Sequence, residues 1–265
     1  MPSSARSLGL PDQITAGLFD LDGVLTSTAD QHRQAWKVTF DAVLAEHEGA
    51  GFREFTHRDY TEYVDGRPRA DGVRQFLASR GITVPEGAPD DPPDMETVYG
   101  IGNRKNELLL RILEQGGAKP YPGSVKYLEA ARDAGLAIGV VTSSANGASV
   151  LDSAGLSHFV QARVDGVVIA RDRLRGKPAP DSFLAGAVAL GVEPSEAAVF
   201  EDALAGVQAA QAGQFGYIIG VDRAGQAEAL RERGADVVVA DLAELLEADS
   251  LGAESLGAES LGDVK

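Results

Sequence analysis

Short apolar runs alternate with longer helix-like stretches through most of the chain. The first run covers residues 14–19 and stops at Asp20. The later runs are 136–141, 197–200, 216–221 and 236–239. The helix-like stretches between them are 124–134, 147–154, 181–190, 203–212 and 224–233. This alternation predicts an α/β fold, a parallel sheet covered by helices on both faces, with a ligand site at the carboxyl ends of its strands.

Residues 29–115 break this alternation. Apolar positions at helical spacing occur there in three segments, around Trp36, around Phe76 and at 98–113. An irregular loop with four prolines, residues 84–94, separates the second segment from the third. We interpret 29–115 as an α-helical domain inserted after the first strand, which leaves 1–28 and 116–248 for the sheet and its helices.

The composition narrows the classes of partner and chemistry. The 265 residues include 24 basic and 40 acidic side chains, for a formal net charge of −16. Because such a chain repels phosphate polymers, we expect no nucleic-acid partner, and any phosphate that it handles should be small and held locally. Cysteine is absent, which excludes disulfides, thiolate metal sites and cysteine nucleophiles.

The first residues do not resemble a signal peptide. Residues 1–6 lack the apolar stretch of a signal peptide, and no apolar run approaches the ~20 residues of a membrane span. We therefore expect a cytoplasmic protein without a membrane partner. The sequence Leu-Gly-Ala-Glu-Ser occurs twice within 251–260, and we expect residues 249–265 to form a flexible tail.

Asp20 and Asp22 follow the first apolar run and are separated by one residue. If the chain stays extended there, both carboxylates face the same side and can serve one site. The alternative is a pair of turn carboxylates that accept hydrogen bonds from their own backbone. The spacing alone does not decide between the two interpretations.

Other polar residues stand at the ends of other predicted strands. They are Thr142 and Ser143 after 138–141, Lys177 within 175–181, and Glu201 and Asp202 after 198–200. Each has a structural alternative: a helix N-cap, a solvated lysine or an acidic pair at a helix N-terminus. Taken together, carboxylates, hydroxyls and a cation at four strand ends predict a single catalytic edge of the sheet.

The chemistry of such an edge follows from its charges. Clustered carboxylates repel one another unless a hard divalent cation lies among them, and oxygen ligands suit Mg²⁺. With the cation and Lys177 in place, a phosphoryl group can approach. One carboxylate can then attack phosphorus to form an aspartyl phosphate, while a second protonates the leaving oxygen. Hydroxyl and amide donors after residue 141 would stabilise the phosphoryl oxygens.

Four motifs in this order resemble those of the haloacid dehalogenase superfamily of phosphotransferases. They are residues 19–26 (FDLDGVLT), 141–144 (VTSS), 176–181 (GKPAPD) and 200–203 (FEDA). The resemblance spans 16–241. Within the superfamily the chain is most similar to the β-phosphoglucomutase-like group. Residues 28–36 (TADQHRQAW), 121–123 (YPG) and 144–147 (SANG) carry that similarity.

The resemblance implies a Rossmann-like core with an inserted helical cap, and it implies a role for each motif residue. Asp20 is the nucleophile and Asp22 the general acid and base. Thr142, Ser143 and Lys177 hold the transferring phosphoryl group. The Mg²⁺ ligands are Asp20, the Asp22 carbonyl, Asp202 and Glu201. The substrate would be a small phosphorylated sugar, and the family tendency is compatible with a monomer.

In the cap, the family places a lysine, a glycine and an arginine on the substrate. Here the corresponding loop, 64–69, reads VDGRPR: Gly66 and Arg69 match, but Asp65 stands where the lysine is expected, and Arg67 could compensate. The resemblance also implies that Asn146 contacts substrate. It implies that His32 orders the acid and base, with an ordinary cap-helix histidine as the alternative.

Three functions follow from these motifs. The first is a mutase that returns the phosphoryl group to another hydroxyl of the same sugar, as in the conversion of β-glucose 1-phosphate to glucose 6-phosphate. The second is a phosphatase with the same residues, and the third is an inactive phosphosugar-binding protein.

Two other motifs are not interpreted as functional. GIGNRK at 100–105 lacks the last glycine of a dinucleotide fingerprint, so that 103–106 is interpreted as a polar helix edge, and GKP at 176–178 is no P-loop.

Overall fold

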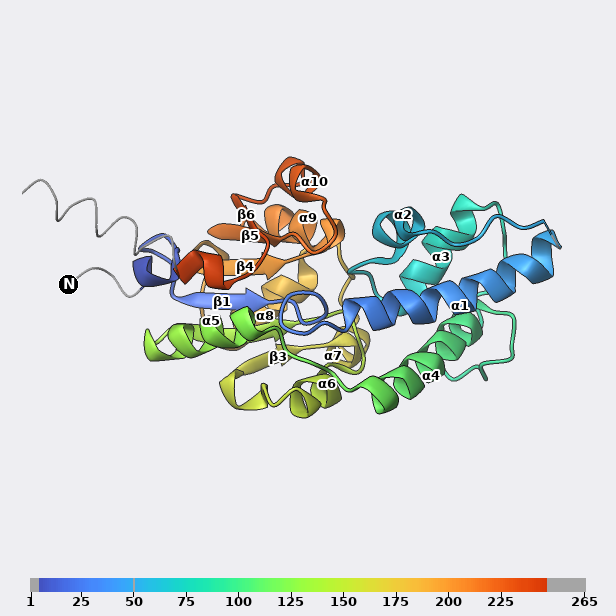
Figure 1. Ribbon diagram of the computed structural model, residues 1–265, viewed down its shortest axis with the longest axis horizontal. Coiled ribbons are helices and arrows are strands. Elements are labelled where there is room, and N and C mark those ends of the chain that lie inside the picture. The colour runs from blue at the N-terminus through green and yellow to red at the C-terminus, as the bar shows by residue number, and fades with distance from the viewer. Residues whose placement is uncertain (1–4, 50, 247–265) are drawn as a thin grey trace, which may run out of the picture.

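The computed structural model describes residues 5–49 and 51–246, and its centre is a parallel six-stranded sheet of order β3-β2-β1-β4-β5-β6 (Figure 1). The strands are β1 (Ala16–Phe19), β2 (Ala137–Val141), β3 (Ala162–Val164), β4 (Ala197–Glu201), β5 (Tyr217–Val221) and β6 (Val237–Val239). The predicted α/β fold is confirmed. The short strand β3 was not predicted, because three residues carry too little pattern to be recognised.

Helices cover both faces of the sheet, as expected. They are α5 (Pro122–Asp133), α6 (Gly147–Ser153), α7 (Gly166–Arg171), α8 (Asp181–Leu190), α9 (Leu204–Ala212) and α10 (Ala227–Glu232). Alternate strand residues face two separate apolar clusters. Phe19 packs with Tyr127 of α5 on one face, whereas Leu18 packs with Phe183 of α8 on the other. Because both faces are buried, the strands are mostly apolar, with Arg163 in β3 and Glu201 at the end of β4 as the charged exceptions.

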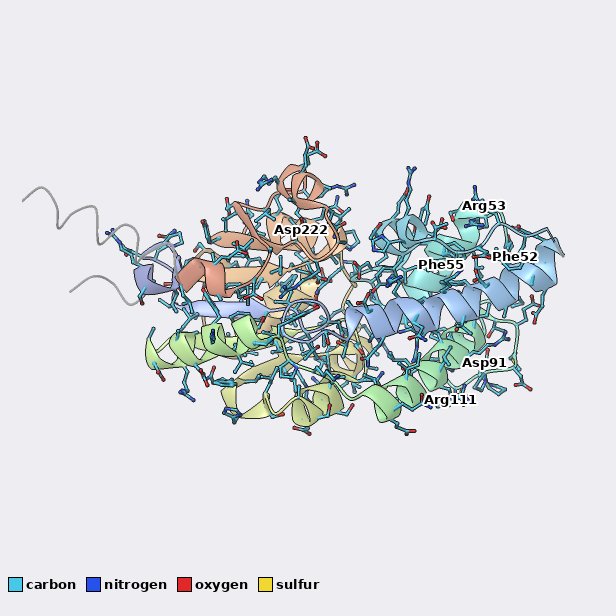
Figure 2. The ribbon with its side chains drawn as sticks, in the orientation of Figure 1. Phe52, Arg53, Phe55, Asp91, Arg111 and Asp222 are labelled. Carbon is cyan, nitrogen blue, oxygen red and sulfur yellow. The ribbon has the colours of Figure 1, made fainter. Side chains whose placement is uncertain are left out.

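The remaining helices form a second body beyond the carboxyl ends of the strands (Figure 1). They are α1 (Ala29–Glu48), α2 (His57–Asp59), the π-helical turn η2 (Tyr60–Val64), α3 (Arg69–Ser79) and α4 (Val98–Gly116). We call this body the helical cap. It has its own apolar cluster, centred on the stacked rings of Trp36 and Phe40 and on Phe55, which is labelled in Figure 2. The domain boundaries given above stay a prediction, and residues 249–265 lie outside the described residues.

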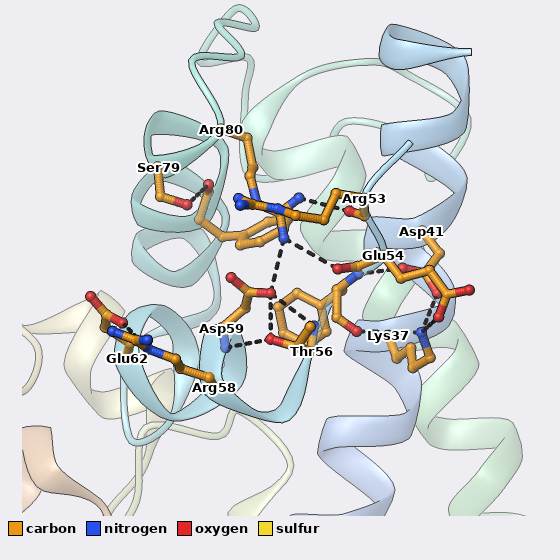
Figure 3. Close-up of polar contacts among 12 residues, drawn as sticks. Lys37, Asp41, Arg53, Glu54, Thr56, Arg58, Asp59, Glu62, Ser79 and Arg80 are labelled. Carbon is orange, nitrogen blue, oxygen red and sulfur yellow. Dashed lines mark hydrogen bonds and ion pairs between the residues drawn. The ribbon is translucent and has the colours of Figure 1, made fainter. Parts of the chain in front are cut away.

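Buried polar groups stabilise the outer part of the helical cap (Figure 3). The Arg80 guanidinium, only 3% exposed, donates to Asp59 at 2.9 Å and to the Arg53 carbonyl at 2.7 Å. Burial alone would raise the pKa of Asp59, but hydrogen bonds from Thr56 and the charge of Arg80 lower it. The Thr56 side chain also caps α2. Such a network fixes the position of η2, which leads into the loop 64–69.

The strand register explains why distant motifs meet. Phe19 of β1 is paired with Val140 of β2 on one side and with Phe200 of β4 on the other. The residues that follow these three positions therefore emerge at one edge of the sheet, facing the helical cap. Within the described residues no helix is both long and apolar enough to cross a membrane.

Candidate active site

A cavity of about 590 Å³ lies between the carboxyl ends of the strands and the helical cap. Eight of the residues selected from the sequence line it: Asp20, Asp22, His32, Gly66, Arg69, Thr142, Ser143 and Asp202. Lys177, Glu201 and Asn146 do not. The structure thus brings residues from the ends of β1, β2 and β4 and from the inserted helices to one site. Separate structural roles for these residues would not explain why they meet at one cavity. Lys177, predicted at a strand end, lies instead in the loop between α7 and α8.

Lys177 lies buried beneath the cavity, between two carboxylates. Its Nζ donates to Asp20 Oδ1 and to Glu201 Oε1, each at 2.6 Å, and the side chain is completely buried. Burial by itself would lower the pKa of the ammonium, but Asp20 and Glu201 raise it above its ordinary value. For Asp20, burial raises the pKa to about 8 in spite of the charge of Lys177. Lys177 is therefore the cation that holds the Asp20 side chain in place.

Both carboxylate oxygens of Asp22 accept hydrogen bonds. The Thr28 hydroxyl donates to Oδ1, and the Thr142 hydroxyl donates to Oδ2 at 3.3 Å. Thr28 is fully buried and follows the turn that leaves β1. Asp22 is thereby held with its carboxylate in the cavity, two residues after Asp20 and supported from a different strand end. This support suits a group that must give and take a proton at a fixed place.

Asp202 adds a third carboxylate to the cavity, and Asp65 a fourth. Burial raises the pKa of Asp202 well above its ordinary value, and the charges of Asp65, Glu201 and Asp20 raise it further. Burial likewise raises the pKa of Asp65 to about 7, while a hydrogen bond with the Tyr60 hydroxyl opposes the shift. Asp65, where the family has a lysine, thus increases the negative charge at the site instead of reducing it.

His32 lies between Asp22 and Lys105. Its Nδ1 is 3.1 Å from Lys105 Nζ, and its Nε2 is 3.6 Å from Asp22 Oδ1. Burial, followed by the charge of Lys105, lowers the pKa of His32 to about 4, so the ring is neutral at pH 7. When Lys105 is charged, its ammonium donates to Nδ1, which leaves Nε2 of the neutral ring toward Asp22. These contacts favour an ordering role over that of an ordinary helix residue.

The sequence pattern predicted Lys105 on the polar edge of a helix and gave it no place in the site. That interpretation of 103–106 is wrong for this residue. Lys105 is 3% exposed, and its ammonium lies 4.9 Å from the ring centroid of Trp36. Burial lowers its pKa to about 7. A signal was present in the sequence, because Lys105 shares a helical stripe with the apolar residues Val98, Ile101 and Leu109.

The helical cap contacts the sheet domain directly at the cavity rim. The Ser143 hydroxyl donates to the Gly66 carbonyl at 2.7 Å, and the Asn146 amide donates to Asn106 Oδ1 at 3.0 Å. Gly66 has φ +72°, and a Cβ there would lie 2.8 Å from that of Ala203. The loop 64–69 therefore needs a glycine at this position for two reasons, its backbone conformation and the close approach to the turn after Asp202.

Two arginines of the same loop also line the cavity. Burial lowers the pKa of both Arg67 and Arg69 below the ordinary value for arginine. The Arg69 side chain lies over Gly102, where a Cβ would be 3.2 Å from Arg69 Cγ. Gly100 and Gly102 therefore allow close packing, and Gly102 leaves room for the Arg69 side chain. These structural roles agree with the interpretation that this segment is not a dinucleotide-binding motif.

The carboxylates fit a hard cation in kind, although no complete set of side-chain ligands is assembled. Among residues 5–49 and 51–246, no group of three or more His, Cys, Asp or Glu side chains stands at metal-binding spacing. Asp20 and Asp202 nevertheless line the same cavity and supply the oxygen ligands that Mg²⁺ prefers. Glu201 fits less well, because Lys177 occupies one of its oxygens and the Ala203 amide donates to the other at 2.7 Å.

Comparison with known proteins agrees with the motifs. The chain is 56% identical over 249 residues to a β-phosphoglucomutase of Mycobacterium bovis. The aligned residues cover 91% of this chain and 95% of that protein. It is 31% identical over 237 residues to validoxylamine A 7'-phosphate phosphatase of Streptomyces hygroscopicus subsp. limoneus, covering 86% of this chain and 94% of the phosphatase.

The fold has close counterparts among solved structures. A β-phosphoglucomutase of Clostridium difficile superposes with a TM-score of 0.70 at 24% identity, covering 92% of this chain and 99% of that one. The haloacid dehalogenase-like hydrolase family matches residues 14–214, which is most of the sheet domain together with the whole helical cap. The chain therefore belongs to the haloacid dehalogenase-like hydrolase family.

Proposed function

We propose that this protein transfers a phosphoryl group between two hydroxyls of a phosphorylated sugar, through an aspartyl phosphate on Asp20. The observation that carries the proposal is that Asp20 and Asp22 line one cavity. Asp20 is fixed by Lys177 from below, and Asp22 by Thr28 and Thr142 from the side. A nucleophile and a proton-transfer group held separately in this way are what phosphoryl transfer requires.

In the first step a carboxylate oxygen of Asp20 forms a bond to phosphorus, and the bond from phosphorus to the sugar oxygen breaks. Asp22, in its protonated form, gives its proton to that oxygen. In the second step Asp22 removes the proton from another hydroxyl of the sugar, which attacks the aspartyl phosphate and restores Asp20. Thr28 holds the Asp22 carboxylate in place through both steps, and His32 Nε2 lies 3.6 Å from it.

We assign Mg²⁺ to Asp20, Asp202 and the carbonyl of Asp22. Bound there, it would offset the charge of the carboxylates and of the incoming phosphoryl group. We give Glu201 a different role from the one expected, that of the buried counter-ion of Lys177, since both of its oxygens accept hydrogen bonds from the protein. We infer that Thr142 and Ser143, which line the cavity, interact with the phosphoryl oxygens by exchanging their present hydrogen bonds to Asp22 and Gly66, and that Lys177, buried beneath the cavity, offsets the charge from there.

On the cap side, Gly66, Arg69 and Lys105 face the sugar across the cavity. Asn146 contacts Asn106 and does not line the cavity, so we assign it to the contact between cap and sheet domain rather than to the substrate. We propose a working monomer, because one chain supplies both walls of the cavity.

A mutase and a phosphatase differ in whether water reaches the aspartyl phosphate. The direct contacts between Ser143 and Gly66 and between Asn146 and Asn106 join the cap to the sheet domain at the rim, which favours transfer back to the sugar. The high identity to a β-phosphoglucomutase supports the same conclusion. The phosphatase remains the second candidate, because Asp65 removes a cation from the substrate side and a curated relative is a phosphatase.

Phosphorus NMR can separate the candidates. The protein would be given β-glucose 1-phosphate, Mg²⁺ and a trace of the 1,6-bisphosphate. We expect glucose 6-phosphate as the main product. Inorganic phosphate alone would establish the hydrolase instead, and no turnover of any phosphosugar would favour a binding protein. Asp20→Asn is the control and should abolish every product, while Asp65→Lys tests whether the missing cation alters the ratio of the two products.

A further inference from the structure

Two segments connect the sheet domain to the helical cap, and they are paired with each other. The first linker, 20–28, leaves β1, and the second, 117–121, leads into α5. The Ser27 amide donates to the Lys119 carbonyl at 2.9 Å, and the Tyr121 amide donates to the Leu25 carbonyl at 3.0 Å. Because the cap has no other chain connection to the sheet domain, any movement of the cap must rotate or bend this pair.

Arg223 contacts the sheet-domain ends of both linkers. It lies in the loop between β5 and α10 and does not line the cavity. Its Nε donates to the Gly23 carbonyl at 3.0 Å, in the first linker. The face of its guanidinium lies 3.8 Å from the ring centroid of Tyr121, in the second. One planar group therefore joins the two linkers where they leave the sheet domain.

The guanidinium is itself anchored by the segment that follows β6. Its Nη1 donates to the Ala240 carbonyl at 2.6 Å and lies 3.6 Å from the carboxylate of Asp241. The side chain is 20% exposed. An arginine can stack and donate in its plane at the same time, whereas a lysine ammonium cannot do both. The observed set of contacts therefore requires arginine in particular.

Hydrogen bonds within the loop that carries Arg223 fix its shape, and a further hydrogen bond connects it to the candidate site. Asp222, labelled in Figure 2 at the end of the sheet that faces the cap, accepts hydrogen bonds from the amides of Ala224 and Gln226 at 3.2 and 2.8 Å. The Gln226 side chain donates to the Asp202 carbonyl at 2.9 Å. Arg223 thus extends from a fixed loop that also holds the turn after β4.

We propose that Arg223 is a positioning residue that fixes the sheet-domain ends of both linkers and so sets how closely the cap shuts over Asp20. The consequence for catalysis rests on the proposed function, in which closure keeps water from the aspartyl phosphate. Without Arg223 the Gly23 carbonyl loses a charged donor and Tyr121 loses its stacking partner, so the linkers should open more often and water should compete better.

The test uses the full chain and three substitutions. Arg223→Gln removes both contacts, and Arg223→Lys keeps the charge without the planar fork. Arg132→Gln is the matched control, because its guanidinium also stacks on a ring, that of Phe159 at 5.4 Å, but touches neither linker. Hydrogen exchange, followed by mass spectrometry without ligand, would report opening of residues 25–28 and 117–121, with peptides of α8 as the internal reference. Phosphorus NMR would report the share of phosphoryl groups lost to water.

We expect Arg223→Gln to speed exchange in both linkers roughly tenfold, with α8 unchanged, and to raise the share lost to water. Arg223→Lys should resemble it, and Arg132→Gln should resemble the parent. Parental linker exchange in Arg223→Gln, or full restoration by lysine, would overturn the inference. Should Arg223→Gln not fold, Tyr121→Leu removes the stacking face alone and must produce the same linker opening. Because exchange needs no substrate, a failure of the proposed mutase activity would leave this result readable.

Discussion

Lys105 is a buried cation whose removal should stabilise the protein. Its side chain is 3% exposed, and its polar neighbours are the neutral ring of His32 and the face of Trp36 rather than a carboxylate at salt-bridge distance. Methionine has a similar length and no charge to bury. We therefore expect Lys105→Met to unfold at a higher denaturant concentration than the parent at pH 7, while its turnover falls because His32 loses its partner.

The size and the pH dependence follow from linkage. The pKa of Lys105 is about 7 in the folded protein and 10.5 in the absence of burial. A group whose pKa is lower in the folded state destabilises that state fully below the folded pKa, and the effect disappears as the pH rises to the unfolded pKa. At about 1.4 kcal/mol per pKa unit, the unfavourable contribution is about 4 kcal/mol at pH 7 and about 2 kcal/mol at pH 9.

Urea unfolding of both proteins at pH 7 and pH 9 would measure this difference. We expect the variant to be more stable at both pH values and its advantage to shrink by about half at pH 9. Lys37→Met is the control, because Lys37 is 43% exposed and bonded to Asp41 and Glu54, so its loss should lower stability slightly. Equal stability of Lys105→Met and the parent, or an advantage that does not change with pH, would refute the reasoning.

Three further results are expected. Asp22→Ala should slow phosphoryl transfer by about 10²–10⁴-fold in a steady-state assay, and an unchanged rate would place the acid and base elsewhere. Gly66→Ala should raise KM and the share of phosphate lost to water. The new Cβ would lie 2.8 Å from that of Ala203, and a φ of +72° disfavours any side chain at this position. Kinetics equal to those of the parent would contradict this expectation. Arg80→Met should lower the free energy of unfolding by about 3 kcal/mol, because it leaves Asp59 without its charged partner; a loss under ~1 kcal/mol would show that the pair contributes little.

The sequence determined the sheet and the edge of the sheet at which the candidate site lies. Apolar runs of strand length alternating with helices specify a parallel sheet, and such a sheet places the ends of its strands along one edge. Asp20, Thr142 and Asp202 could therefore be assigned to one site from their positions directly after apolar runs. The same reasoning applies to any residue whose location depends only on the strand that precedes it.

The tertiary structure alone decided which side chains from distant parts of the chain meet. The burial of Lys105 against Trp36, the engagement of Glu201 by Lys177 and the contact of Arg223 with both linkers each join segments that are far apart in the chain. Local periodicity reports which face of an element is apolar but not which element covers that face. The packing of elements that are distant in sequence settles these contacts, because the energy of each contact arises only when both elements are brought together.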